Sequence, residues 1–299
     1  MFTFLSSAQS IMLLALLSSV SRAGLNVVDR YQIGFREFSI RQVNLWNNVI
    51  PTLLMVILLL FSGLGHEFLQ SLISWKTIFF SGLVQLVAYA FSFGFRHLNV
   101  NQVTATAKLS DIFIPIGIFV FTSHWSWSNY SFAILTTLVC LPILWNKKKI
   151  FVSFDRGGLF IIGALVLQAS FAPLLIEPPI NSGFSFQHLF LFTISVLFWR
   201  SIWTILPLFF QKQSLPMRWN LSYLNYISLL RVILTILTQI SFIFAITSPN
   251  SLVAWPILNS TGLFALFFSK QFLKEYHTHK EQGIVIAISF LEIIRFLSL

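Results

Sequence analysis

Residues 101–121 read "NQVTATAKLSDIFIPIGIFVF", a stretch long and apolar enough to cross a bilayer as a helix, yet it carries two opposite charges near its middle. Lys108 and Asp111 lie three residues apart, so they share one helical face and can pair. A charged side chain at the bilayer centre costs about 2.5 to 3.5 kcal/mol on insertion scales, so this face is expected to point into the protein. The pair then either locks helix packing or lines a cavity, where it contacts substrate or carries a proton.

The composition of the whole chain is that of an integral membrane protein. Its 299 residues are 56% hydrophobic and only 9% charged, too few polar side chains for the surface of a soluble domain. Apolar runs of about 17 to 25 residues can cross the hydrocarbon as helices. Ten such runs are expected, at 4–23, 44–63, 76–96, 102–122, 128–145, 157–176, 187–209, 224–247, 251–270 and 282–298. We therefore predict an all-α, ten-span membrane protein.

A weak internal repeat relates the stretch at 101–121 to a second one at 250–270. At a shift of about 149 residues it aligns with "NSLVAWPILNSTGLFALFFSK", and "ALLSSVSRAGLNVVD" from Ala15 aligns with "ALVLQASFAPLLIEP" from Ala164. We expect a five-helix half at 1–149 and another at 150–299, within a single transmembrane domain. Because five is odd, the second half enters the membrane in the opposite sense. Inverted repeats of this kind are common in transporters, which hold substrate near the midplane where the halves meet.

Three segments carry a resemblance to a known family. They are the end of the first span, "SRAGLNVVDRYQIG"; the passage "LVAYAFSFGFRHLNVNQVTATAKLSDIFIPIGIF"; and its second-half counterpart "IFAITSPNSLVAWPILNSTGLFALFFSKQFLKE", with Lys274 and Glu275 near its end. With ten helices in two halves, the chain resembles the drug/metabolite transporter (DMT) superfamily, specifically its EamA-like members, which have an acidic residue after helix nine.

That resemblance implies a secondary active transporter that works by alternating access. The expected partners are a small organic metabolite (amino-acid-like, nucleotide-related or drug-like), the lipid bilayer, and protons or a counter-substrate. We hypothesise that Asp111 titrates during transport, while the opposite charge of Lys108 holds it ionised at rest. The expected location is a bacterial inner membrane.

Polar side chains in other spans are further candidates for substrate or coupling contacts. Arg200 and Arg231 lie within the seventh and eighth spans; Arg200 could bind an anionic group bidentately, and either could instead snorkel or pair with an acidic neighbour. Trp255 and Asn259, on the counterpart of the Lys108 segment, would extend a polar patch across the pseudo-axis. The remaining candidates lie on helices that line the pathway in the resembled family: Asn26, Gln85, Tyr89 and Gln168. Such groups also hydrogen-bond helix to helix.

Other chemistry has little support in the sequence. The net charge of +10 comes mostly from loop residues that orient helices in the membrane, so no nucleic acid is expected. No Gly-rich phosphate loop appears, which argues against direct ATP coupling, and "HTH" at 277–279 lacks further ligands at zinc spacing, so neither a metal nor a cofactor is expected. The alternative class is a membrane-embedded enzyme that acts on a lipid-soluble substrate. It lacks a recognisable pair of nucleophile and base.

Orientation and the first segment leave alternatives open. Fourteen Lys and Arg residues lie in the odd-numbered loops, whereas the loops on the other side hold only Lys76 and Arg295. By the positive-inside rule this distribution places both termini outside. The resembled family keeps both termini in the cytoplasm. The first run could also be a signal peptide, because small residues follow its apolar core, but no basic residue precedes that core, which favours a retained span.

Overall fold

The computed structural model describes residues 8–123, 127–144, 156–175, 186–209, 226–247, 257–258, 261–276 and 278–297. The longer elements in these segments are α2 (Ala8–Arg30), α3 (Ile40–Ser62), α5 (Trp75–His97), α8 (Trp127–Leu144), α9 (Arg156–Leu175), α10 (Phe186–Phe209), α11 (Tyr226–Thr247) and α14 (His279–Leu297). The shorter ones are η1 (Tyr31–Phe35), α4 (Gly65–Ile73), α6 (Val100–Lys108), η2 (Leu109–Ile112), α7 (Ile114–Thr122), α13 (Thr261–Phe268) and η5 (Ser269–Leu273). All are helical, so the predicted all-α class is confirmed for the described segments.

Several of these helices can cross a membrane. Five segments in the described chain are long and apolar enough: Gln9–Phe35, Ile40–Ser62, Trp75–His97, Gln187–Leu206 and Tyr226–Ala245. The bent pair Val100–Ile112 and Ile114–Phe121 makes a sixth if it is one span, and Tyr130–Pro142 and Gly157–Ala172 are shorter apolar segments. The chain is therefore a multi-pass membrane protein, while the count of ten spans stays a prediction.

The expected span at 102–122 is a broken helix. α6 starts with a capping box, in which the Asn99 side chain accepts from the Gln102 amide and the Gln102 side chain accepts from the Asn99 amide. It ends at Lys108, and a single 3₁₀ turn leads into α7 with a bend of 40°. Pro115 explains the break, because it has no amide hydrogen and its ring would clash with the carbonyl of Asp111 in a continuous α-helix. Lys108 and Asp111 thus lie at the break.

The first helix extends further than its hydropathy predicts. The apolar run was expected to end at residue 23, whereas α2 continues to Arg30 and a π-helical turn follows to Phe35. Hydropathy falls over this last part. Asp29 is nevertheless paired with Arg231 of α11, and Arg30 is paired with Glu275 in the segment after η5, so the helix remains packed inside the protein. The short helix α4 between the second and third spans was not predicted.

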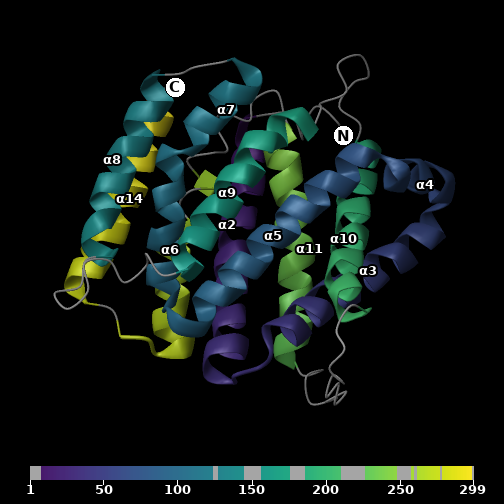
Figure 1. Cartoon of the computed structure of the whole chain (residues 1–299), viewed down its shortest axis with the longest axis horizontal. Coiled ribbons are helices and arrows are strands. Elements are labelled where there is room, and N and C mark those ends of the chain that lie inside the picture. Colours follow the sequence, from purple (N-terminus) through teal and green to yellow (C-terminus); the bar gives the residue numbers. More distant parts are fainter. Residues whose placement is uncertain are drawn as a thin grey trace.

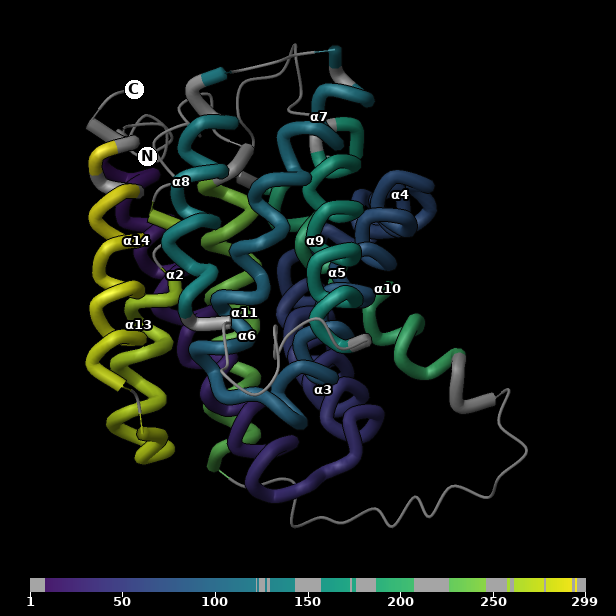
Figure 2. Tube along the Cα trace, turned by 60° about the vertical axis from the view of Figure 1, so that its left-hand side comes forward, coloured from purple at the N-terminus to yellow at the C-terminus, as the bar shows by residue number. Residues whose placement is uncertain are grey.

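The helices pack mainly across the two halves of the chain (Figure 1). The most extensive pairs are α2 with α11, α5 with α9, α3 with α10 and α5 with α10, followed by α2 with α13 and α7 with α9. At one flank α14 packs on both α8 and α13 (Figure 2). Helices α5, α6 and α9 approach one another closely at Gly94 of α5. An added Cβ on Gly94 would lie 2.8 Å from Ile161 Cδ1 of α9 and 3.2 Å from Val103 Cγ2 of α6, so a side chain has no room there.

Candidate functional site

A forked ion pair joins the first helix to the second half of the chain. Arg231 of α11 donates from Nε to Asp29 Oδ1 at 2.7 Å and from Nη2 to Asp29 Oδ2 at 3.1 Å, which is the bidentate geometry that guanidinium and carboxylate prefer. The third guanidinium nitrogen, Nη1, donates to Thr235 Oγ1 one turn along α11. Asn47 of α3 adds a 3.3 Å hydrogen bond to Asp29 Oδ1. All three nitrogens of Arg231 are therefore used.

A chain of amides connects α3 and α5 to Arg200 of α10. Gln85 Oε1 accepts from Asn48 Nδ2 at 2.8 Å and from Arg200 Nε at 3.3 Å, while Gln85 Nε2 donates to Asn44 Oδ1 at 3.2 Å. Asn44 Nδ2 in turn donates to Ser92 Oγ at 2.9 Å. These bonds determine which end of each amide points where, so the oxygen of Gln85 faces Arg200. All of these side chains are buried.

We call these two groups together the central network; its residues are Asp29, Asn44, Asn47, Asn48, Gln85, Ser92, Arg200, Arg231 and Thr235. Two hydroxyl contacts lie on the same helices. Thr52 of α3 and Ser201 of α10 share a 2.9 Å hydrogen bond, and Trp203 Nε1 donates to Ser81 Oγ of α5 at 3.1 Å. The network thus bridges α2, α3, α5, α10 and α11.

Lys108 and Asp111 form the predicted ion pair at a separate place. Lys108 Nζ lies 3.1 Å from Asp111 Oδ2, with 11% and 22% of the two side chains exposed. Thr137 of α8 donates to the Lys108 carbonyl at 3.2 Å, which satisfies a backbone group at the end of α6. Both residues are on α6 and η2, which pack on α8, α9 and α13, whereas the central network belongs to other helices.

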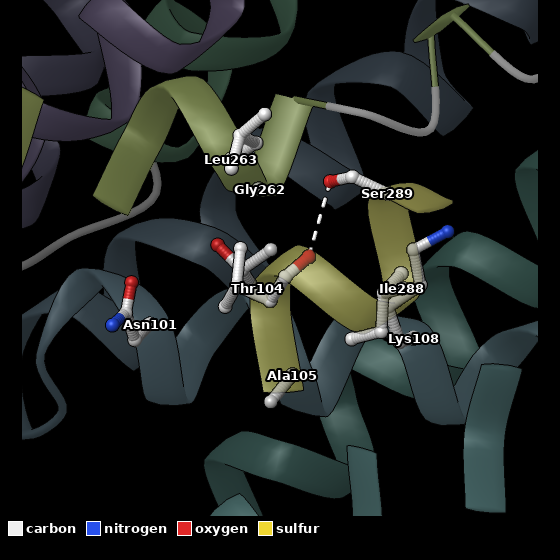
Figure 3. Close-up of a pocket in the computed structure, with 9 residues that line it drawn as sticks. Asn101, Thr104, Ala105, Lys108, Gly262, Leu263, Ile288 and Ser289 are labelled. Atoms are coloured by element: carbon white, nitrogen blue, oxygen red, sulfur yellow. Dashed lines mark hydrogen bonds between the residues drawn. The ribbon is translucent and has the colours of Figure 1, made fainter. Parts of the chain in front are cut away.

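Lys108 also lines a small cavity between α6, α13 and α14 (Figure 3). Asn101 and Thr104 of α6 and Gly262 of α13 are on its wall, with apolar side chains and Ser289 from α14. The Ser289 hydroxyl is turned to its own helix, where it donates to the Val285 carbonyl at 3.1 Å. The cavity therefore brings the Lys108 segment beside the second-half helices, but its lining is mostly apolar.

A third polar group closes one end of the bundle. Arg30, the last residue of α2, donates from Nε to Glu275 Oε1 at 3.0 Å and from Nη1 to the Phe95 carbonyl at 2.6 Å. The other oxygen of Glu275 accepts from the Val100 amide at 3.3 Å, where a carboxylate is favoured because Val100 opens α6. We call Arg30, Glu275, the Phe95 carbonyl and the Val100 amide the end clasp. It ties α2, α5, α6 and the segment after η5 together.

The predicted site residues thus fall into different places. Gln85, Arg200 and Arg231 belong to the central network, and Arg231 has the acidic partner that was one of its three predicted alternatives. Lys108 and Asp111 pair elsewhere; Asn26 and Gln168 are partly buried on α2 and α9, and Tyr89 packs against the cluster of Ile33, Ile40 and Val43. Trp255 and Asn259 lie outside the described residues.

Four acidic or amide residues of the central network were not predicted as site residues: Asp29, Asn44, Asn47 and Asn48. A signal was present: Asn44 and Asn48 are four apart in an otherwise apolar run, and Asn47 lies beside them, which places polar groups on one side of a helix. Among the described residues, no cluster of three or more His, Cys, Asp or Glu side chains is arranged to hold a metal ion. No family model matches the chain, and no curated protein matches it.

Proposed function

We propose that the protein is a ten-span secondary active transporter of the drug/metabolite type, built from two inverted five-helix halves. It moves a small organic metabolite across a bacterial inner membrane by alternating access, coupled to protons or to an exchanged counter-substrate. We assign the substrate pathway to the central network, which joins helices of both halves, and proton coupling to the pair of Lys108 and Asp111.

The observation that carries this proposal is a symmetry in the helix contacts: if each helix is replaced by its counterpart in the other half, the contacting pairs become other contacting pairs. Counted along the chain, α2, α3, α5, the α6–α7 pair and α8 have as counterparts α9, α10, α11, α13 and α14. Replacing each helix by its counterpart converts the contact of α2 with α11 into that of α9 with α5. It converts the contact of α2 with α13 into that of α9 with α7, and both resulting pairs are also major contacts. The pairs α3·α10 and α8·α14 each map onto themselves. A two-fold relation between the halves accounts for this pattern.

The hydrogen bond between Thr52 and Ser201 gives independent support. The two residues are 149 apart, which is the shift at which the sequence matches itself. They therefore occupy equivalent positions in the two proposed repeats. A residue touches its own counterpart only close to a two-fold axis. The α3·α10 contact is then the place where the axis passes.

Buried polar residues favour a transport role over a purely structural one. Ionisable side chains inside membrane spans are costly and usually mark substrate or ion pathways. Here Asp29, Arg200 and Arg231 lie on three membrane-crossing helices from both halves. The broken helix at Lys108 is of the kind that transporters place beside their binding sites.

The test is uptake into proteoliposomes that contain the purified full chain. The probes are radiolabelled glutamate, alanine, uridine monophosphate and adenosine, each measured with and without an imposed pH gradient, and again with the unlabelled compound preloaded. Saturable uptake that accelerates with a gradient or with preloading supports the proposal. Absence of flux for the whole panel, with chemically altered product released from an added lipid-soluble substrate, would instead establish the enzyme alternative.

A further inference from the structure

The buried arginines of the central network differ in how their hydrogen-bond donors are used. Arg231 is neutralised by Asp29 through two bonds, with its remaining nitrogen on Thr235. Arg200 contacts no carboxylate among the described residues: its Nε donates to the neutral amide oxygen of Gln85, and Nη1 and Nη2 make no hydrogen bond within the described part of the chain. Arg200 is nevertheless only 6% exposed. Within the described residues, its charge is therefore buried without a carboxylate in contact.

The charges around Arg200 add to this excess. Within the described part of the chain, Arg231 and Arg22 repel the Arg200 guanidinium and Asp29 attracts it. Arg22 of α2 has its guanidinium carbon 4.9 Å above the Phe242 ring, a contact that leaves its positive charge in place. Among these described groups, positive charges outnumber negative ones. In a low-dielectric interior such an excess attracts an anion strongly.

The geometry of Arg200 fits an anion with a planar or tetrahedral oxygen group. The amide chain through Asn48, Gln85 and Asn44 holds Gln85 Oε1 toward Arg200, so the guanidinium is anchored at Nε. Anchoring at Nε leaves the Nη1 and Nη2 donors, which can bind two oxygens of a carboxylate or phosphate side by side. A lysine at this position would offer a point charge without that fork.

We infer that Arg200, supported by Arg22, is the binding site for the anionic group of the substrate, and that the substrate is a small organic anion with a carboxylate or phosphate. This deepens the proposed function by naming the substrate class, and its transport aspect depends on that function. Anion binding itself does not depend on the proposed function, because the excess positive charge is present whether or not the protein transports its ligand. The Asp29–Arg231 pair positions α2 and α11 around the site rather than contacting the anion.

The test measures binding apart from transport. The full chain in detergent is heated with succinate or inorganic phosphate, and with neutral succinamide and sodium chloride at matched concentration and ionic strength. A ligand that binds the folded state raises the apparent melting temperature. We expect saturable shifts with succinate or phosphate that succinamide and chloride do not produce. Arg200→Gln should weaken the apparent affinity at least tenfold, Arg200→Lys should weaken it less, and the exposed Arg96→Gln should leave it unchanged.

The outcomes separate this inference from the proposed function. Equal shifts in the wild type and in a folded Arg200→Gln variant, or equal shifts with succinamide, would overturn the anion site. If that happens while proteoliposomes still take up alanine or adenosine, transport stands and the substrate class is wrong. Charge-specific binding that depends on Arg200, without any flux, would retain the anion site and reject the transporter. Arg22→Gln provides the second variant, with weaker binding expected even if Arg200→Gln does not fold.

Discussion

Thr52 and Ser201 share a 2.9 Å hydrogen bond between two hydroxyl groups that are 149 residues apart in the chain. Thr52 also donates to the Leu197 carbonyl at 2.9 Å, so one hydroxyl fastens α3 to α10 at two points. This contact joins the helices at the centre of the proposed two-fold relation.

A double-mutant cycle measures how strongly this contact couples the two helices. Thr52→Val and Ser201→Ala remove the hydroxyls singly and together, and we expect a coupling free energy of about 0.6 kcal/mol, the average for interhelical hydrogen bonds in membrane proteins. The measurement is unfolding of the detergent-solubilised protein by denaturant. Thr136→Val of α8 with Ser201→Ala, a pair on helices that make no major contact, should be additive.

Removal of the charge on Asp29 should be among the most destabilising single changes in the described chain. Asp29→Asn leaves Arg231 buried without its counter-charge, and breaking a buried pair on one side costs about 3 to 5 kcal/mol. Thermal unfolding should show the loss, and Asp29→Asn with Arg231→Gln should recover part of it. The exposed Glu37→Gln is the matched control. A single variant as stable as the wild type would contradict this account of the pair.

Asp111→Asn tests whether the ion pair at the helix break couples transport to protons. If Asp111 titrates, the variant transports slowly or loses the pH dependence of its rate, because the position can no longer exchange a proton. The measurement is uptake into proteoliposomes over a range of external pH, with the exposed Glu67→Gln alongside. A normal rate with unaltered pH dependence would assign Lys108 and Asp111 to packing.

The end clasp should restrict access of water to the interior at its end of the bundle. Val103, one turn into α6, is fully buried in the same hydrophobic cluster as Phe95 and Val100 of the clasp. We expect Val103→Cys, in a Cys140→Ser background, to react several-fold faster with a membrane-impermeant maleimide when Glu275→Gln removes the negative charge that pairs with Arg30. The exposed Lys270→Gln should not change the rate. Equal rates in all three backgrounds would show that the clasp does not control access.

The sequence predicted the helices better than the contacts between them. The spans expected at 157–176 and 187–209 agree with Arg156–Leu175 and Phe186–Phe209 to within one residue, because hydrophobicity alone determines where such a helix enters lipid. The end of α2 was not predicted because its polar residues are stabilised by partners distant in sequence, which a local hydropathy average does not include. Asp29 depends on Arg231, and Arg30 depends on Glu275.

The candidate site was only partly visible for the same reason. Lys108 and Asp111 are three apart, so their pairing could be predicted from helix geometry, and the structure confirms it. The link from Asn44 through Gln85 to Arg200 joins three separate helices, and no local pattern specifies it. Intramembrane polarity identified Gln85 and Arg200 as candidates but did not show that one holds the other.

The pairing of Asp29 with Arg231 also sets a condition on biosynthesis. The arginine follows the aspartate by 202 residues, and at about 5–20 residues per second the ribosome needs on the order of 10–40 s to cover that interval. Throughout that time the first helix has been synthesised with a carboxylate whose partner does not yet exist. The nascent chain must therefore keep this end of the helix near water, in the insertion machinery or protonated until the later helix arrives. Defects at Arg231 should accordingly appear first as failed insertion and degradation of newly made chains, before any effect on mature protein is seen.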